Sequence, residues 1–409
     1  MRDKAKLCVL LGYIAVMGLV WLLREPILAL LDRSALESAV LKLIFPALSI
    51  LGLAGLLRIF GGSLGCKLLH NNFERVGFVS SAGETPQLIA KCRDKENPKL
   101  TINKFETASI PLKEWEDKRH KVASAMNAHI EKIIECESKR RINVYAVSAK
   151  TNLPTKLMWN DSYLSQSDTI FILGESLTGT VRMDVSKTNN ILLGGSTGGG
   201  KTNLLQLLVY QAIRKGWQVV VGDLKGGCDF SEFQCKVLSH IGEVQYHLGT
   251  LVAELDERKE KVRSAGVTDI DEYNQRAGDK LERILFACDE VAELLDKTGR
   301  DKSSKEIISI IEGYLATLAR QGRAFGIHLF LATQRPDANV LPGQIRNNID
   351  YRVCGRAESV LSQIVLDSSI ANEIPKDIPG RFVNHEAVVF QAYWFNARKA
   401  FDDLERGQT

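Results

Sequence analysis

The sequence predicts an α/β fold for most of its 409 residues, preceded by a helical hairpin in a membrane. From about Thr169, apolar strand-like runs alternate with helix-like segments, which indicates a largely parallel sheet with helices on both faces. A glycine-rich stretch lies between one such strand and the helix that follows it. At the other end of the chain, seventeen residues from Leu7 to Leu23 carry no charge.

Composition sets few limits on function. The formal net charge of +4 is compatible with DNA or an anionic membrane as a partner but requires neither. The eight cysteines have irregular spacing, without a CxxC or Cys/His metal pattern. Reduced thiols facing the cytoplasm therefore fit better than a disulfide framework.

Two apolar runs predict membrane spans at about residues 7–23 and 42–60. The first is near the lower length limit for a span, and the second reaches that limit if Lys42 and Arg58 snorkel. A secretory signal remains an alternative for the first run, although no small-residue cleavage site follows it. A buried or interfacial helix remains an alternative for the second, which Pro46 would kink.

Basic residues flank this hairpin more densely than they occupy its loop. The flanks carry Arg2, Lys4, Lys6, Arg58, Lys67 and Arg75, and the loop carries Arg24 and Arg33. Because positive flanks stay in the cytoplasm, we expect a multi-pass protein of the cell membrane with both termini inside.

We expect three parts in the chain: a transmembrane hairpin (1–65), a small membrane-proximal α/β domain (66–165) and a larger α/β domain (166–409). In the middle part, residues 99–110 and 142–149 are strand-like. Between them, apolar residues recur at helical spacing from Trp115 to Ile133, which predicts a helix that begins at Pro111.

Four apolar runs of the third part end in small or polar residues: NILLGG, WQVVVGD, RILFACDE and IHLFLATQ. Such endings are typical of parallel strands whose carboxyl ends bind ligands at one edge of the sheet.

The glycine-rich stretch from Gly195 to Thr202 matches the phosphate-binding pattern G-x-x-x-x-G-K-[ST], with a strand before it and an apolar helix after it. Its backbone N–H groups would surround phosphate oxygens, Lys201 would reach the β- and γ-phosphates, and Thr202 would ligate Mg²⁺. The predicted nucleotide-binding residues are Gly195, Ser196, Thr197, Gly198, Gly199, Gly200, Lys201, Thr202 and Asn203.

Two acids end the RILFACDE run. Asp289 is predicted to hold the Mg²⁺ shell together with Thr202, and Glu290 to polarise the attacking water. The pair predicts a RecA-like P-loop NTPase of the additional-strand, catalytic-glutamate type. Two solvated acids that begin a helix are the alternative.

Gln334 ends the IHLFLATQ run, where it would contact the γ-phosphate or the water; a cap of the strand end is the alternative. Asp223 ends another run at the same edge, and Lys225 follows it in a basic, glycine-rich loop.

These segments together resemble the FtsK/SpoIIIE family of DNA-translocating ATPases. The resemblance covers roughly Phe171 to Phe395, and is strong in AELDERKEKVRSAGVTDIDEYNQ and in ARQGRAFGIHLFLATQRPDANVLPGQIRNNIDYRVCGRAES. Chromosome translocases of the family have more spans and a DNA-reading winged-helix domain. This chain is therefore more similar to the FtsK-like coupling proteins of Gram-positive conjugative plasmids and integrative elements.

The resemblance implies a homo-hexameric ring that hydrolyses ATP with Mg²⁺ and threads DNA without sequence specificity. A relaxase and mating-channel proteins would be its partners. The family completes each site with an arginine from the neighbouring subunit, for which Arg352 and Arg356 are candidates and Arg323 is the third. Lys225, Arg335 and Arg346 are predicted to grip DNA phosphates.

Three other functions remain open at this point. One is an FtsK-like ATPase of a protein-secretion system, although such exporters tend to carry several P-loop modules. Another is a chromosome-segregation translocase that lacks a DNA-reading domain. The last is a membrane adaptor that binds nucleotide only to assemble, against which Lys201, Asp289 and Glu290 argue.

Overall fold

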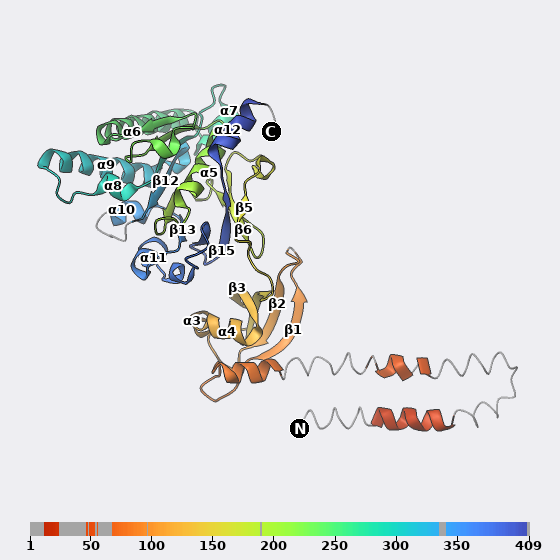
Figure 1. The fold of residues 1–409 in the computed structure, drawn as a ribbon. Helices are drawn as coiled ribbons and strands as arrows, with labels where there is room; N and C mark the ends of the chain where they lie inside the picture. The colour runs from red at the N-terminus through yellow and green to blue at the C-terminus, as the bar shows by residue number, and fades with distance from the viewer. Residues whose placement is uncertain are drawn as a thin grey trace. The chain divides into compact units, whose positions relative to one another are not determined.

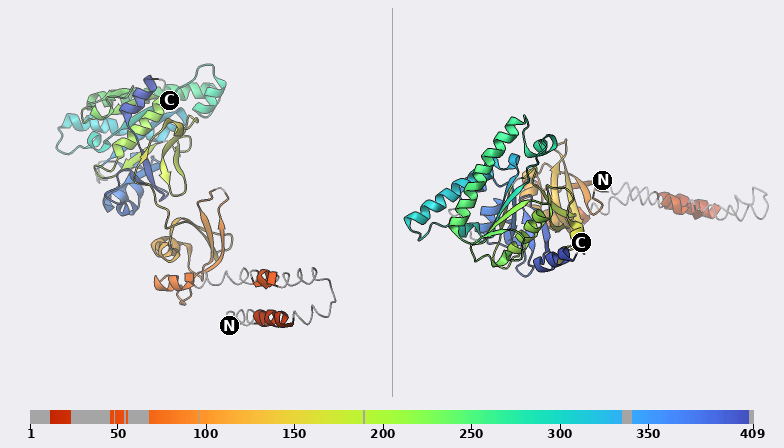
Figure 2. Two further views of the ribbon diagram at one scale, coloured as in Figure 1. Left: turned by 45° about the vertical axis from the view of Figure 1, so that its right-hand side comes forward. Right: turned by 90° about the horizontal axis from the view of Figure 1, so that it is seen from above.

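The computed structural model describes residues 12–23, 46–47, 49–53, 55, 68–95, 97–188, 190–334 and 341–406. The chain divides into two compact units, residues 1–150 and 151–409. Figure 1 shows the elements of each unit in sequence colours, and Figure 2 shows them from two further directions.

The predicted hairpin lies partly outside the described residues. Residues 12–23 are helical, as are the described residues between 46 and 55. The two segments contact each other, since the Tyr13 hydroxyl donates to the Ser49 carbonyl at 2.9 Å. Within the residues that can be described, no helix has both the length and the apolar character that a membrane span needs. The hairpin stays a prediction.

The rest of the first unit is a four-stranded antiparallel sheet in the order β1-β2-β4-β3. Its helices, which include residues 68–75, pack on it around Phe73, Phe105 and Trp115. The elements are β1 (Gln87–Arg93), β2 (Thr101–Glu106), α3 (Leu112–Asp117), α4 (Arg119–Met126), β3 (Ala128–Glu135) and β4 (Arg141–Ser148).

One helix expected in this unit is wrong in its second half. The chain leaves α4 at Asn127, which has a left-handed φ of 47°, and continues as strand β3. A bulge between Ile130 and Lys132 shifts the pairing of β3 with β4. Ile130 and Ile133 therefore both pack against the core although they are three residues apart. The helical spacing in the sequence arises from this bulge.

The second unit is built on an 11-stranded sheet in the order β10-β9-β11-β12-β8-β13-β14-β15-β6-β7, with β5 paired to β15. The strands from β10 to β13 in this order are parallel. The run from β13 to β7 is antiparallel. Strand β12 lies between β8 and β11, which is the additional strand that the sequence predicts.

The strands are β5 (Leu157–Met158), β6 (Ile170–Ser176), β7 (Thr180–Asp184), β8 (Ile191–Gly194), β9 (Gln218–Gly222), β10 (Lys236–Leu238), β11 (Ile284–Cys288), β12 (Ile327–Thr333), β13 (Tyr351–Gly355), β14 (Arg381–Asn384) and β15 (Val389–Trp394). The helices are α5 (Lys201–Arg214), α6 (Ile241–Ser264), α7 (Ile270–Arg276), α8 (Val291–Leu295), α9 (Lys302–Gln321), α10 (Gly343–Arg346), α11 (Ser359–Leu366) and α12 (Ala397–Glu405). Short 3₁₀ turns are η1 (Asp161–Tyr163), η2 (Cys228–Phe230), η3 (Arg323–Phe325) and η4 (Ile370–Glu373).

Helices cover both faces of this sheet, as predicted (Figures 1 and 2). On one face, Phe286 of β11 joins a core with α6 and α9. On the other face, Leu285 joins a core with α5 and α12. Because successive strand residues point to opposite faces, the buried strands read as continuous apolar runs in the sequence.

Candidate active site

The phosphate-binding pattern forms a tight loop from the end of β8 to the start of α5. Its backbone takes positive φ angles of 138°, 77° and 95° at Gly195, Gly198 and Gly200. These angles lie in a region that side-chain-bearing residues rarely adopt. The helix α5 begins directly at Lys201, so its first N–H groups face the space that the loop encloses.

Two backbone segments hold this loop from either end. The N–H of Ser196 donates to the carbonyl of Arg356 at 2.7 Å, and the N–H of Gly380 donates to the carbonyl of Gly199 at 3.0 Å. A Cβ atom on Gly200 would lie 3.1 Å from the Gly380 nitrogen. The segments after β13 and before β14 therefore fix the shape of the loop, a contact that no sequence motif indicates.

Lys201 lies inside the loop, with 4% of its surface exposed. Its ammonium donates to the carbonyls of Gly195 at 2.6 Å and Ser196 at 3.0 Å. Burial lowers the pKa of this ammonium, and attraction to Glu290 and Asp289 opposes that shift. Phosphate oxygens can replace the two carbonyls as acceptors, which is the role that the sequence predicts for this lysine.

Thr202 and Asp289 meet across the site. The Thr202 hydroxyl donates to Oδ1 of Asp289 at 2.8 Å, and Asp289 is 2% exposed. A hydroxyl and a carboxylate are hard oxygen ligands of the kind that Mg²⁺ takes beside phosphate oxygens. Within the described residues, no three His, Cys, Asp or Glu side chains gather as a metal site. The protein would thus supply two metal ligands, Thr202 and Asp289. This small number fits a magnesium ion whose other ligands are phosphate oxygens and water.

Glu290 lies next to Asp289 and faces the end of β12. Its carboxylate accepts hydrogen bonds from the Thr333 hydroxyl at 3.1 Å and from the Gln334 N–H at 3.1 Å. Only 9% of Glu290 is exposed, and this burial raises the pKa of its carboxyl, while the bonds from Thr333 and Gln334 lower it. A carboxylate with a raised pKa, held in position, is suited to accept a proton from water.

Gln334 joins the acid pair to the phosphate loop. Its side-chain oxygen accepts a hydrogen bond from the Thr197 hydroxyl at 2.7 Å, while its N–H binds Glu290. The register of the parallel strands produces this meeting, because Thr333 pairs with Gly194 at the end of β8. Lys201, Asp289, Glu290 and Gln334 therefore converge on one edge of the sheet.

The comparisons with known proteins agree with this geometry. Residues 165–338 match the FtsK/SpoIIIE family. The chain is 32% identical to the solved structure of the pCW3 conjugation coupling protein TcpA, in its monomer form with ATPγS. That match covers 84% of this chain and 99% of TcpA, with a TM-score of 0.62. The chain belongs to the FtsK/SpoIIIE family.

Two curated FtsK/SpoIIIE relatives match over shorter stretches. The DNA translocase FtsK of Campylobacter jejuni subsp. jejuni serotype O:2 is 28% identical over 226 residues, which are 51% of this chain and 23% of that protein. The DNA translocase SftA of Bacillus subtilis (strain 168) is 31% identical over 215 residues, which are 49% of this chain and 21% of that protein. The chain thus spans about a quarter or less of the length of these two relatives.

Asn203 follows the phosphate loop and is predicted to contact the nucleotide, but its side chain binds the backbone of Phe395 in the structure. Its side chain donates to the carbonyl of Phe395 at 2.6 Å and accepts from the N–H of Phe395 at 3.0 Å. These bonds join α5 to the end of β15. The contact with nucleotide stays a prediction, and the structure gives Asn203 a connecting role that the sequence did not indicate.

The candidate arginines all have partners within the chain. Arg352 donates to the carboxylate of Asp367 at 2.6 Å and to two backbone carbonyls. Arg356 donates to the Ile374 carbonyl at 3.1 Å, and Arg323, at the opposite edge of the sheet, to the Lys187 carbonyl at 3.1 Å. Which of them acts on a neighbouring subunit stays a prediction.

The three residues predicted to grip DNA have different surroundings, and their contact with DNA stays a prediction. Arg335 lies outside the described residues. Arg346, in α10, lies near the Ile364 carbonyl. Lys225 lies in the active site, where its ammonium binds Oδ2 of Asp289 at 2.9 Å. Sequence reasoning missed this contact, although Lys225 follows a strand that ends at the same edge as Asp289.

Proposed function

We propose that this chain is a membrane-anchored ATPase that hydrolyses ATP with Mg²⁺ to translocate DNA, as a coupling protein of conjugative transfer. The convergence of Lys201, Thr202, Asp289 and Glu290 carries the enzymatic part. Similarity to TcpA along nearly all of that chain supports the conjugative part. The FtsK and SftA relatives support DNA as the cargo.

Each group at the site has a step to perform. Lys201 would exchange the carbonyls of Gly195 and Ser196 for phosphate oxygens, while the loop N–H groups bind the same phosphates. Thr202 and Asp289 would hold the magnesium ion, which neutralises charge on the phosphates.

Glu290 would accept a proton from the water that attacks the γ-phosphorus. A positioned base of this kind contributes about 10²–10⁴-fold to a rate. Thr333 and Gln334 hold its carboxylate in place. Gln334 also contacts Thr197 of the loop. Loss of the γ-phosphate would therefore change the position of the residues at the end of β12.

Translocation requires a ring in which neighbouring subunits share sites, and we propose a homo-hexamer. An arginine supplied in trans would stabilise charge on the transferring phosphoryl group. Arg356 could couple the phosphate loop of its own subunit to the site of the neighbouring subunit, because its carbonyl accepts a hydrogen bond from Ser196 of the loop. Arg352 would first have to leave Asp367.

DNA-stimulated ATP hydrolysis by the full chain in lipid is the test. We expect linear DNA to raise the turnover rate at low salt, and the effect to shrink as salt rises, because phosphate contacts release counterions. Glu290→Gln provides the background rate. Turnover that is unchanged by single- or double-stranded DNA would refute translocation and leave protein secretion as the function to examine.

Mixing two inactive variants tests the ring. Lys201→Ala has a dead nucleotide site but an intact arginine, and Arg356→Ala has the reverse. If Arg356 acts in trans, mixed rings regain turnover. The regained activity arises at interfaces where the intact nucleotide site of an Arg356→Ala subunit meets the intact arginine of a Lys201→Ala subunit. No recovery with Arg356, and none with Arg352 or Arg323 in its place, would contradict a shared site.

A further inference from the structure

The carboxylate of Asp289 is fully engaged within the chain. Its Oδ1 accepts from Thr202, and its Oδ2 forms an ion pair with the ammonium of Lys225 at 2.9 Å. The Asp289 side chain is 2% exposed, and that of Lys225 is 40% exposed. Lys225 therefore approaches from the solvent side and places a positive charge where a metal-bound nucleotide would place another.

A second carboxylate lies beside the same lysine. Asp223, at the end of β9, is 1% exposed, and its Oδ1 accepts from the backbone N–H of Lys225 at 3.1 Å. Its Oδ2 is buried and has no hydrogen-bond partner among the described residues. A buried acceptor without a donor is costly, so this oxygen calls for a partner in some state of the protein.

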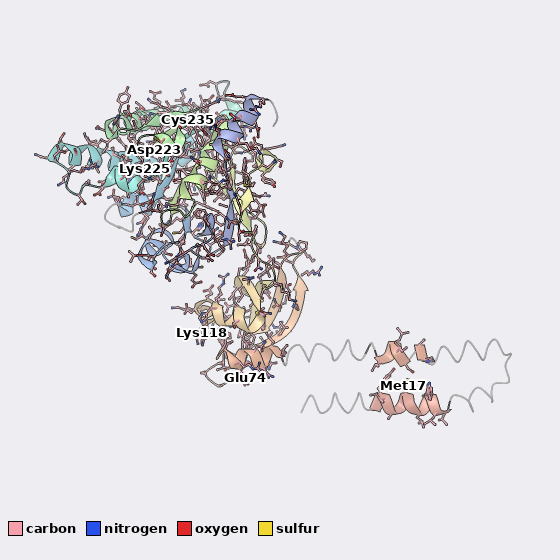
Figure 3. The ribbon with its side chains drawn as sticks, in the orientation of Figure 1. Met17, Glu74, Lys118, Asp223, Lys225 and Cys235 are labelled. Carbon is pink, nitrogen blue, oxygen red and sulfur yellow. The ribbon has the colours of Figure 1, made fainter. Side chains whose placement is uncertain are left out.

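Two glycines follow Lys225 in its loop. Gly226 and Gly227 follow it with φ angles of 98° and 74°. Around the Cβ position of Gly226, the nearest atom is the Cys228 sulfur at 4.0 Å, so the backbone there is not packed in. Figure 3 labels Asp223 and Lys225 together in the second unit, and the two are only two residues apart in the chain.

The surroundings of the loop are acidic. Burial raises the pKa of Asp229, and the negative charges of Asp289 and Asp223 raise it further. For Lys225, burial lowers the pKa of the ammonium, but the bond to Asp289 and the nearby carboxylates outweigh it and raise the pKa overall. Among the described residues, the ion pair that Lys225 forms is with Asp289, and Asp223 and Asp229 lie in the same segment of the chain.

We propose that Lys225 gates the metal position: its ammonium holds Asp289 while the site lacks nucleotide, and moves to Oδ2 of Asp223 when magnesium nucleotide binds. This rests on the proposed nucleotide site. Two cations beside one buried carboxylate repel each other, so Mg²⁺ and the Lys225 ammonium compete for Asp289. The Oδ2 atom of Asp223, which lacks a hydrogen-bond partner among the described residues, offers the displaced ammonium a second acceptor. Lys225 is thus a positioning residue, and the position of its ammonium depends on whether magnesium nucleotide is bound.

The competition is measured as a ratio of two affinities. ATPγS binding to the full chain is followed by calorimetry, once with Mg²⁺ and once with EDTA, and the ratio of the two dissociation constants gives the gain from the metal. In Lys225→Met this gain should rise by up to about tenfold, because the bond between Lys225 and Asp289 no longer has to be broken and the bond that Asp223 would offer offsets only part of it. Lys225→Gln should change it in the same direction. Lys236→Met, which removes a charge from an exposed lysine in β10, should leave it unchanged.

Asp223→Asn tests the second position. The amide keeps an oxygen for the turn but removes the charge, so the displaced lysine loses its acceptor and the gain from Mg²⁺ should fall. In the double variant Lys225→Met/Asp223→Asn, the gain should equal that of Lys225→Met alone. A double variant that instead falls below Lys225→Met would show that Asp223 acts on the metal directly, and would overturn the transfer.

An unchanged or reduced gain in both Lys225→Met and Lys225→Gln would overturn the gate. Binding of ATPγS by the unaltered chain separates this outcome from failure of the proposed function. If the unaltered chain binds no ATPγS under either condition, the nucleotide site itself is refuted and the gate with it. Thermal unfolding of each variant shows that a lost gain is not a lost fold.

Discussion

Asn203→Ala separates a structural role of this residue from the nucleotide-binding role that the sequence predicts. The asparagine side chain makes two hydrogen bonds with the backbone of Phe395, at 2.6 and 3.0 Å. Each bond contributes about 0.5–1.5 kcal/mol. Phe395 is buried, so its N–H and carbonyl would be left without partners in a place that water does not reach freely.

We therefore expect Asn203→Ala to lower the free energy of unfolding of the second unit by about 2 kcal/mol. For a unit of this size, that loss corresponds to a fall in Tm of roughly 4–8 °C. Calorimetry of the full chain measures it, and the transition that ATPγS raises identifies the second unit. Affinity for ATPγS, measured well below the new Tm, should change less than threefold.

The control is Asn372→Ala in η4, an exposed asparagine whose amide has only a long contact of 3.4 Å with Ser359. It should change stability by less than about 0.5 kcal/mol. The reasoning fails if Asn203→Ala leaves Tm unchanged and weakens ATPγS binding tenfold or more. That result would return Asn203 to the nucleotide.

Three further changes examine the groups that converge on the phosphate loop. Lys201→Ala should abolish the rise in Tm that ATPγS produces, because it removes the ammonium that lies inside the loop, where the phosphates would bind. Glu290→Gln should bind ATPγS normally yet hydrolyse ATP about 10²–10⁴-fold more slowly, since the amide cannot accept the proton; a normal kcat would contradict its role. Thr333→Val removes a hydrogen bond that favours the carboxylate, so the pKa of Glu290 should rise further. Glu290 then takes up its proton at higher pH, and the acidic limb of the kcat profile should move upward; a limb that stays in place would contradict the assignment.

Much of the second unit follows from apolar runs and their endings. The strands β8, β9, β11 and β12 are each too short for a helix and are buried on both faces, which makes the pattern unambiguous. Because all four are parallel, their polar endings had to meet at one edge. Lys201, Asp289, Glu290 and Gln334 were predictable for this reason.

Contacts that depend on tertiary pairing were not predictable. Nothing in the sequence around Gly380 indicates that its N–H binds Gly199, because the contact depends on how β14 follows β13 in the sheet. The bulge in β3 led to the wrong prediction of a helix, because spacing alone cannot distinguish a bulged strand from a helical turn. The contacts of Asn203 with Phe395 and of Lys225 with Asp289 were not predictable for the same reason, because the partners are far apart in the sequence.

The described charged groups that converge on the phosphate loop each have a partner within the chain. Lys201 binds loop carbonyls, Asp289 binds Thr202 and Lys225, and Glu290 binds Thr333 and Gln334. Nucleotide binding is therefore an exchange of partners, and its measured free energy is the difference between two sets of bonds. It follows that removing a charge need not weaken binding. Loss of Lys201 removes a partner of the nucleotide, whereas loss of Lys225 removes a competitor of the metal. The two lysines should therefore shift affinity in opposite directions, although both are cations that interact with Asp289.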